Sequence, residues 1–557
     1  MAKFLCLGRS GPCGLLSTKF RALILANLLL AQVPSQSAPP AQPDKKLTFS
    51  ETHYAGGVEL ARKGDFTRAL EEFQQAAELD PRNPKVHNIL GVALSQLGRL
   101  TDANEAFNHA LALSPNFYPA RKNRATNAFL QRNYTFAASE FKDLARLQPK
   151  DFVSPLFLGL LAIEGSNILE AREHLLRARQ LAPGDRRVLQ ALVRVHFMLG
   201  ERQLAIKTAR EVRLSSNATH PERFELGVLL AQFEANAEAT DIFKDLWNEK
   251  PGSYDVGFNL ALTQYRSGQP AAALRTVEEL NSHGAQAPEI WNLQGWIYIS
   301  IGLQDSAIAS FRQALAAEPA RVEHYLDLST ALMNAGDWLS AEHVISEGLE
   351  KDVDKDRLYV QMGLFYRRNR DLRQAETWYR RAIETNPSNE AAYIALAHIL
   401  LNGEHDGEAL ALLEESLERL PASSLLNYVY GSLLLETAAP ENRDQLEKAR
   451  FVLEKALALN PFFANTHYRL ARLFLLKSNE DKALEHFQKA ISLNPKNTGA
   501  LYQLSRLLAR RGERERAAEL RKALQRLHAE KDKLIQELAH QSSDRSPAVE
   551  LIPKPKD

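Results

Sequence analysis

The chain of 557 residues contains only two cysteines, Cys6 and Cys13, and both lie close to its first residue. From residue 14 onward it therefore excludes disulfides, thiolate catalysis and cysteine-ligated metal. A surplus of charge is missing as well, since the net charge is +1, and removing the four basic residues of 1–37 leaves −3. A near-neutral chain lacks the basic footprint of a nucleic-acid-binding protein, so no nucleic-acid partner is expected.

Sequence motifs of catalysis are also missing. Residues 50–540 contain no phosphate-binding loop, dinucleotide fingerprint, nucleophile elbow or His-Glu-x-x-His helix. The segment from Asp352 to Asp356 begins like a calcium loop, but Arg357 and Gly363 occupy the places that require glycine and glutamate. The fifteen histidines are scattered along the chain. The sequence therefore predicts no catalytic residue, no metal site, no cofactor and no enzyme activity.

A strict period is the main positive feature of the chain. Alanine recurs at one constant interval, with a single longer interval between Ala409 and Ala449, at Ala69, Ala103, Ala137, Ala171, Ala205, Ala239, Ala273, Ala307, Ala341, Ala375, Ala409, Ala449, Ala483 and Ala517. A small residue stands twelve positions before nearly every alanine, and a proline stands twelve positions after most of them. Such a period is typical of a repeat array, in which each unit buries its apolar face only against its neighbours.

The unit from Asn83 to Phe117 shows how one repeat folds. Apolar residues at helical spacing predict a first helix that ends before Gly98, because glycine accepts the left-handed conformation that closes a helix. A second apolar face begins at Ala103, and Pro115 ends that helix because proline cannot continue its hydrogen bonds. Each repeat is therefore predicted to be a first helix, a short turn, a second helix and another short turn.

Small residues in the first and second helices are required by close helix packing, since a larger side chain would wedge the helices apart. A recurrent aromatic residue four positions after the alanine is predicted to fill the space between repeat units. It occurs at Phe73, Phe107, Phe141, Phe243, Phe311, Tyr379 and Phe487. These residues are interpreted as core.

The period, the small residues and the terminal proline resemble the tetratricopeptide repeat family, whose units have about 34 residues. The resemblance implies an all-α fold, an α-solenoid that winds as a right-handed superhelix, with about fourteen units over residues 50–540. The longer interval before Ala449 predicts a six-residue insertion near 437–444, expected as a bulged turn. The last unit is expected to end in a C-terminal capping helix, and the proline-containing tail 541–557 is expected to be disordered.

The first 49 residues do not belong to the repeat. Four basic residues precede an apolar run from Ala22 to Val33, and a Pro- and Ser-containing stretch follows. This layout predicts a secretory signal peptide at 1–37 and a flexible linker at 38–49, and hence a periplasmic or secreted protein. Twelve residues are too few to span a bilayer, so no stable membrane span is expected in the mature chain. The alternative is an uncleaved hydrophobic start on a cytoplasmic or N-terminally anchored protein.

A partner-binding groove is predicted on the first helices. With each repeat numbered so that its terminal proline holds place 32, the resemblance implies that the second, fifth, ninth and twelfth places line the concave face. In the sixth to eighth repeats the candidate groove residues are Phe224, Phe258, Tyr265, Asn292, Trp296 and Ile299. Large apolar side chains on an open surface favour docking of a peptide or helix. The alternative is that neighbouring repeats bury them.

Basic residues offer a second candidate site, for an anionic ligand. Lys122 holds a fifth place, and Arg367 and Arg368 belong to a basic stretch around a turn. Either could hold an acidic segment or an anionic polymer. The alternative is a solvated turn. Some family members clamp the C-termini of chaperones, but Thr126 replaces the asparagine that this clamp requires, so no such clamp is predicted.

The overall prediction is a non-enzymatic, exported scaffold that captures protein partners through its concave surface. Its layout is similar to that of bacterial envelope proteins of the family, which assist secretion or outer-membrane assembly. The alternative function is a guide or carrier for an anionic polysaccharide in the envelope.

Overall fold

The computed structural model describes residues 45–543, except 215–217, 352 and 440. Within these residues it contains twenty-eight helices and no strands, which confirms the predicted all-α solenoid. The first helices of the repeats are α2 (Lys45–Arg62), α4 (Pro84–Gln96), α6 (Tyr118–Leu130), α8 (Val153–Glu164), α10 (Arg186–Met198), α12 (His220–Gln232), α14 (Tyr254–Arg266), α16 (Pro288–Ser300), α18 (Val322–Ala335), α20 (Lys355–Arg368), α22 (Glu390–Asn402), α24 (Ser424–Thr437), α26 (Ala464–Leu476) and α28 (Thr498–Arg510).

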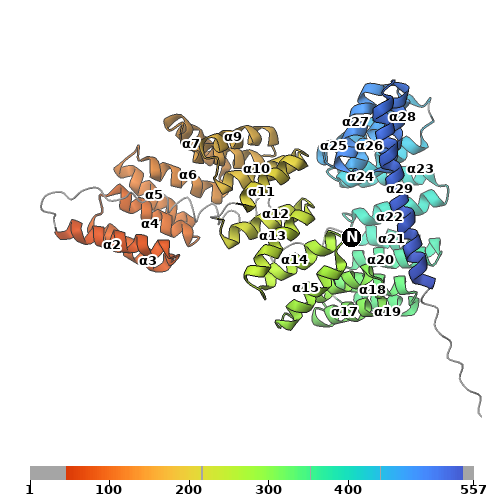
Figure 1. Ribbon diagram of the computed structural model, residues 1–557, viewed down its shortest axis with the longest axis horizontal. Helices are drawn as coiled ribbons and strands as arrows, with labels where there is room; N and C mark the ends of the chain where they lie inside the picture. The colour runs from red at the N-terminus through yellow and green to blue at the C-terminus, as the bar shows by residue number, and fades with distance from the viewer. Residues whose placement is uncertain (1–44, 215–217, 352, 440, 544–557) are drawn as a thin grey trace, which may run out of the picture. The chain divides into compact units, whose positions relative to one another are not determined.

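The second helices alternate with the first. They are α3 (Phe66–Leu79), α5 (Leu100–Leu113), α7 (Tyr134–Leu147), α9 (Ile168–Leu181), α11 (Arg202–Arg213), α13 (Asn236–Glu249), α15 (Pro270–Ser282), α17 (Gln304–Ala317), α19 (Trp338–Glu350), α21 (Leu372–Thr385), α23 (Asp406–Arg419), α25 (Arg443–Leu459), α27 (Glu480–Leu493) and α29 (Arg514–Ser543). Figure 1 shows these helices as successive hairpins along the chain.

The turn within most repeats contains a residue with positive φ, and this residue is not always glycine. Gly98 closes α4 with a φ of 77°, and the amide of Arg99 donates to the carbonyl oxygen of Leu94 at 2.9 Å. The corresponding place holds a non-glycine residue with positive φ in six other repeats, at Arg132, Ser166, Glu234, Arg370, Glu404 and Ser478. Packing of the two helices therefore imposes a left-handed residue even where the side chain disfavours it.

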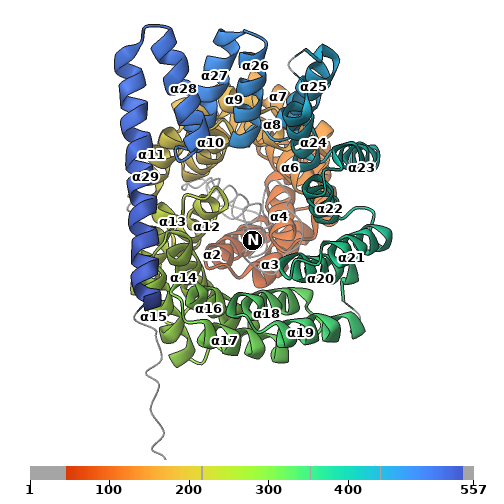
Figure 2. The same ribbon diagram turned by 90° about the vertical axis from the view of Figure 1, so that its right-hand side faces the viewer.

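The array divides into two compact units between Gln286 and Ala287. The N-terminal unit contains α2–α15 and the C-terminal unit contains α16–α29, and each is described by itself. In the C-terminal unit, Figure 2 shows α18, α20, α22 and α24 on the inner side of the curve and α19, α21, α23 and α25 on the outer side. The first helices of this unit thus present the surface on which the predicted groove places lie.

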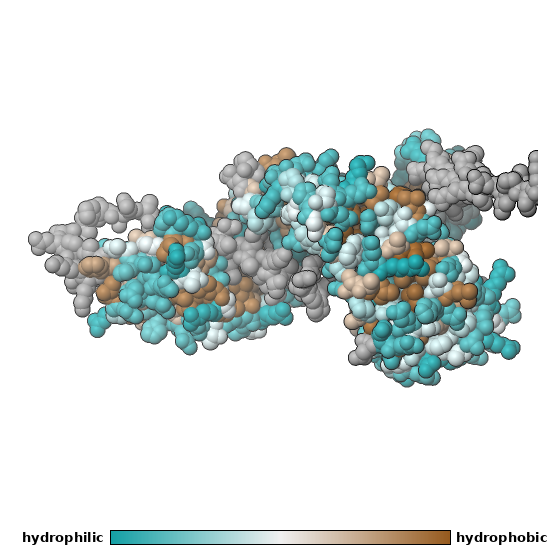
Figure 3. Space-filling model, turned by 90° about the horizontal axis from the view of Figure 1, so that it is seen from below, coloured by the Kyte–Doolittle hydropathy of each residue, from teal (hydrophilic) through white to brown (hydrophobic). Residues whose placement is uncertain are grey.

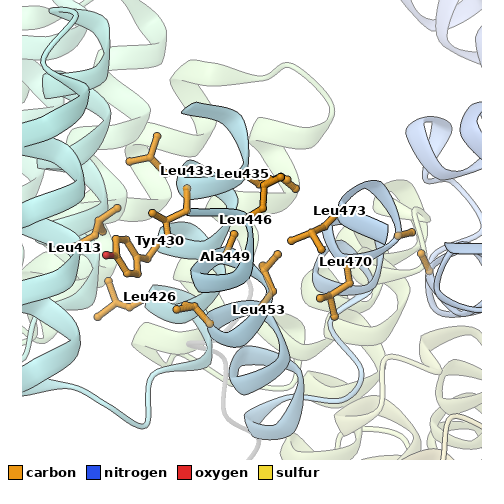
Figure 4. Packing of buried hydrophobic residues seen from close by; sticks show 14 of the residues in the cluster. Leu413, Leu426, Tyr430, Leu433, Leu435, Leu446, Ala449, Leu453, Leu470 and Leu473 are labelled. Atoms are coloured by element: carbon orange, nitrogen blue, oxygen red, sulfur yellow. The ribbon is translucent and has the colours of Figure 1, made fainter. Parts of the chain in front are cut away.

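The longer interval before Ala449 does not form only a bulged turn. The turn 438–442 is two residues longer than the three-residue turn between α4 and α5. Three further residues lengthen α25, which has 17 residues where α23 and α27 have 14, and one lengthens α24, which has 14 residues where α22 and α26 have 13. Leu446 and Ala449 on α25 remain buried in the core that they share with Tyr430 of α24 (Figure 4). Most of the insertion is therefore helical, because its side chains extend a helix that already has a core to pack against.

The two ends of the array differ from the prediction in their boundaries. α2 begins at Lys45, so the predicted linker 38–49 is wrong over its last five residues, which contain no proline or glycine to interrupt a helix. At the other end α29 has 30 residues and reaches Ser543. The predicted signal peptide 1–37 and nearly all of the predicted tail 541–557 lie outside the described residues. Among the helices that are described, none has the length and apolarity needed to cross a bilayer.

Hydrophobic side chains also reach the surface of both units. Figure 3 shows hydrophobic patches between hydrophilic residues on one face of the molecule. Several of the exposed apolar side chains belong to second helices, such as Leu339 on α19 and Phe451 on α25, which are 83% and 66% exposed. Single exposed apolar residues are common on protein surfaces and do not by themselves mark a binding site.

Candidate partner-binding surfaces

The predicted groove residues of the N-terminal unit are half-buried and pack inside their own repeats. Phe224 meets the ring of Phe243 on α13 edge-on, with centroids 5.6 Å apart. Phe258 stacks on Tyr254 of the same helix, with centroids 6.1 Å apart. Tyr265 is half-buried too, and burial raises the pKa of its hydroxyl. Each ring therefore contributes to packing and presents only part of its surface to a partner.

The predicted residues of the C-terminal unit belong to α16. Asn292 is buried, whereas Trp296 and Ile299 are half-buried. The Trp296 ring packs edge-on against Phe311 of α17, with centroids 5.5 Å apart. Because the chain divides between Gln286 and Ala287, the six predicted groove residues fall into two separate units.

Asp327 on α18 organises the predicted residues of α16. The side-chain amide of Asn292 donates to Asp327 Oδ2 at 2.6 Å, and Trp296 donates a second hydrogen bond to the same carboxylate. Burial raises the pKa of Asp327 to about 6, although these two hydrogen bonds oppose the increase. Glu323 raises the pKa further, and Arg357 lowers it. We name Asn292, Trp296, Ile299 and Asp327 the Asp327 surface.

An ion-pair network borders the Asp327 surface on α18 and α20. Arg357 pairs with Glu323 at 2.6 Å, and Arg321 contacts the same glutamate at 3.6 Å. Arg321 also pairs with Glu318 at 3.1 Å. Glu323 and Arg357 hold the second places of adjacent repeats. Two opposite charges that lie one repeat apart at the same place could have predicted this ion pair from the sequence.

An open cavity of about 750 Å³ lies beside this network. It is bounded by the turn between α17 and α18 and by the turn between α19 and α20, and its polar lining includes Glu318, Arg321, Glu323 and Asp354. The volume falls within the range of about 300–1,000 Å³ that is usual for ligand pockets. The cavity therefore gives a partner side chain space beside the ion-pair network, and none of its lining residues belongs to the Asp327 surface.

Lys122, predicted as an anion ligand, is already neutralised. Its ammonium lies 3.6 Å from the carboxylate of Asp151, and its side chain is only 13% exposed. Asp151 also accepts a hydrogen bond of 2.5 Å from the hydroxyl of Tyr118. Sequence reasoning did not anticipate this pairing, because the partner carboxylate belongs to the turn that precedes the next repeat. The structure therefore offers little charge at Lys122 for an additional anion.

The two other predicted basic residues remain accessible. Arg367 and Arg368 are exposed at the end of α20. Arg368 donates to the side-chain carbonyl of Asn334 at 2.8 Å. They belong to the C-terminal unit, whereas Lys122 belongs to the N-terminal unit.

A second cavity, of about 460 Å³, was not predicted from the sequence. It lies between α26, the start of α27 and α28, and it is lined by Arg472, Leu475, Leu476, Ser478, Glu480, Gln503, Arg506 and Arg510. We name it the arginine pocket. Arg472 and Arg506 hold the ninth place of consecutive first helices, one of the places expected to line the groove. The sequence therefore contains two arginines at the same groove-lining place of consecutive repeats, whereas the predicted groove was placed on the aromatic residues of the sixth to eighth repeats.

Metal chemistry finds no support in the described part of the chain. No group of three or more histidine, cysteine, aspartate or glutamate side chains is gathered there in a way that could hold an ion. His467 and His486 do approach, with their Nδ1 atoms 3.0 Å apart, but two nitrogens without a third ligand are better explained as packing.

Comparison with family models identifies the repeats directly. Models described as "Tetratricopeptide repeat" match residues 54–116, 230–297, 288–321, 356–399 and 464–497. The matches fall in both units.

Individual proteins are similar over parts of the chain. The chain is 30% identical over 122 residues to the protein O-mannosyl-transferase Tmtc1 of Drosophila melanogaster. The aligned region covers 21% of this chain and 14% of that protein. It is 21% identical over 320 residues to the BBSome complex member BBS4 of Bos taurus. Here the aligned region covers 57% of this chain and 60% of that protein. The match thus spans less than two thirds of either relative. The crystal structure of yeast Tom70 aligns with a TM-score of 0.45 at 15% identity, over 84% of this chain and 97% of that chain.

Proposed function

Because this chain belongs to the tetratricopeptide repeat family, we propose that it is a protein–protein interaction scaffold that captures a partner peptide or helix on the first helices of its C-terminal unit. The observation that carries this proposal is the Asp327 surface. A half-buried tryptophan is held there by the ring of Phe311 and by the half-buried carboxylate of Asp327.

A fixed aromatic side chain is a good binding anchor. Tryptophan contributes a large contact area, and a ring whose position is already set loses little conformational entropy when a partner binds. The hydrogen bonds from Asn292 and Trp296 to Asp327 supply this order before binding. A partner that places an apolar side chain on the exposed part of Trp296 would gain contact area at low entropic cost.

Site-specific photo-crosslinking tests this proposal. Asn292 is unsuitable as the position of the crosslinker, because it is buried and hydrogen-bonded. Arg367 is exposed at a twelfth place on α20, and Arg373 is exposed on the second helix α21 of the same repeat. A photoreactive residue at Arg367 should capture a discrete protein, and the same residue at Arg373 should not. Equal capture at both positions, or none at Arg367 in folded protein, would overturn the proposed surface.

The cellular setting that we propose is the cell envelope, where the scaffold would assist secretion or assembly. Support comes from the basic residues and the apolar run from Ala22 to Val33 that precede the array. The alternative, a carrier for an anionic polysaccharide, draws on the exposed Arg367 and Arg368, but the pairing of Lys122 with Asp151 removes one of the three residues on which it rested. Scaffolding of protein partners is therefore the better-supported function.

A further inference from the structure

The arginine pocket carries positive charge that the surrounding residues do not neutralise. Arg510 is paired with Glu480 at 3.4 Å. In contrast, neither Arg472 nor Arg506 contacts a carboxylate within the part of the chain that the structure describes. Arg472 is half-buried, and the guanidinium of Arg506 lies over the ring of Tyr502, 5.7 Å from its centroid. A guanidinium has five N–H donors in a planar fork, so both arginines keep donors available for an anion.

Apolar side chains stand next to these donors. Leu476 is 53% exposed and Tyr502 is 47% exposed, and Leu475 lines the pocket as well. A ligand that fits must therefore combine an anionic group with apolar contact area. Carboxylate side chains that alternate with leucine or phenylalanine on a peptide provide this combination.

The neighbouring helices fix the position of the pocket. Tyr468 of α26 packs over Gly499 of α28, where a Cβ atom would lie 2.9 Å from the tyrosine hydroxyl. Tyr468 therefore packs against the start of α28, where only glycine leaves room for its ring. The pocket is part of the packed fold and does not depend on a ligand to form.

Charge around the pocket favours a short acidic segment over a long anionic polymer. Arg511 is paired with Asp481, and Arg516 is paired with Glu513. With Glu480 at the pocket itself, three carboxylates interrupt the basic residues of this end of the unit. A regularly charged polymer requires a continuous basic strip, whereas one or two carboxylates require only the two unpaired guanidiniums.

We propose that the arginine pocket binds an acidic peptide segment of a partner protein, through Arg472 and Arg506 for its carboxylates and through Leu476 and Tyr502 for adjoining apolar side chains. The inference rests on the scaffold function proposed above and adds the chemical class of one bound segment. It uses a surface separate from the Asp327 surface.

Fluorescence anisotropy with the full chain tests the inference. The probe is a labelled ten-residue peptide of alternating aspartate and leucine, compared with its asparagine–leucine analogue and with labelled alginate as the anionic polysaccharide. The aspartate peptide should bind and the asparagine analogue should not. Raising the salt concentration from about 0.05 M to about 0.5 M should weaken the binding, because exposed charge pairs are screened.

Variants of the two arginines locate the binding. Arg472→Gln and Arg506→Gln should each lower the affinity for the aspartate peptide by about tenfold, as expected when a charge-assisted hydrogen bond is lost. Arg373→Gln, which removes an exposed arginine on the outer helix α21, is the matched control and should have no effect. Circular dichroism should show the same helical content in all three variants.

Three results would overturn the inference. They are no binding of the aspartate peptide, binding that is unchanged in the double variant Arg472→Gln/Arg506→Gln, and arginine-dependent binding of alginate without binding of the peptide. If the crosslinker at Arg367 still captures a protein in any of these cases, the scaffold function stands and only the pocket assignment fails. Loss of capture at Arg367 with intact peptide binding would instead count against the Asp327 surface alone.

Discussion

Phe311 occupies the space that a side chain at Gly295 would need, since a Cβ atom at Gly295 would lie 2.6 Å from the ring carbon Cε1 of Phe311. The same relationship recurs in other repeats, for example between Gly91 and Phe107. It confirms the prediction that the small residue of the first helix allows close approach of the second. In the eighth repeat the same phenylalanine also packs against Trp296 of the proposed binding surface.

Gly295→Ala should therefore destabilise the C-terminal unit by about 1–3 kcal/mol, the usual cost of overpacking a core contact. The measurement is thermal unfolding followed by far-UV circular dichroism. Gly407→Ala is the matched control, because Gly407 is helical on α23 and a Cβ atom there would meet nothing within 4 Å. That variant should be neutral or gain up to about 1 kcal/mol from helix propensity. Equal effects of the two substitutions would contradict the packing argument.

The repeat period predicted most of the fold because each core contact lies at a fixed place. Gly295 and Phe311 could be assigned to the core from spacing alone, and so could the ends of the helices. The period could not predict the division after Gln286 or the helical extension of α25, because these depend on how well adjacent repeats pack. Repeat spacing defines neighbours and does not measure the strength of their contact.

The candidate sites were predicted less well, for a physical reason. Trp296 was identified from its place, but the partner that orders it, Asp327, holds a sixth place on the next helix, outside the set expected to face the groove. Lys122 appeared accessible from its place, yet Asp151 neutralises it. Charge pairing between repeats depends on side-chain reach, which spacing along one helix does not reveal.

Asp327→Asn should stabilise the C-terminal unit at about pH 7 by about 1–3 kcal/mol. The folded-state pKa of Asp327, about 6, lies above its value in the unfolded chain. Between about pH 4 and about pH 6 the folded chain therefore keeps a proton on Asp327 that the unfolded chain has already released. The stability that this residue contributes is therefore complete below about pH 4 and is lost as the pH rises through about 6. Asparagine mimics the protonated form at every pH.

Urea unfolding at a series of pH values measures this effect. The difference between Asp327→Asn and the unmodified chain should shrink as the pH falls from about 7 to about 4. Asp354→Asn is the control, since that carboxylate is 69% exposed beside the same cavity, and it should leave the pH dependence unchanged. A destabilised Asp327→Asn variant at about pH 7 would show that the ionised carboxylate is favourable and would contradict the raised pKa.

Export should depend on the apolar run before the array. Leu29→Glu places a charge in the uncharged, mainly apolar run from Ala22 to Val33 and should retain the protein in the cytosol, because a signal peptide requires an uncharged apolar region. Cell fractionation followed by immunoblotting measures the distribution. Gln42→Glu adds the same charge outside the run and should leave the distribution unaltered. An identical distribution of both variants and the unmodified chain would contradict the proposed export.

Acid should destabilise the C-terminal unit through His467. Burial lowers the pKa of His467 to about 4, and burial also lowers the pKa of its neighbour His486. Because the folded-state pKa of His467 lies below the unfolded value of about 6.5, the unfolded chain gains a proton first as the pH falls. The resulting loss of stability between about pH 6.5 and about pH 4 should reach about 2–3 kcal/mol for this residue.

His467→Gln removes the titrating ring while its side-chain amide can still donate to the carbonyl oxygen of Pro461, which lies 3.2 Å from His467 Nε2. The thermal midpoint of this variant should fall less between about pH 6.5 and about pH 4 than that of the unmodified chain. His405→Gln is the control, because the His405 side chain is 59% exposed. If His467→Gln and the unmodified chain lose stability in parallel, the acid sensitivity arises from other groups. A buried neutral imidazole must take up a proton as the pH falls, whereas an amide never titrates, so the two cannot give the same pH profile.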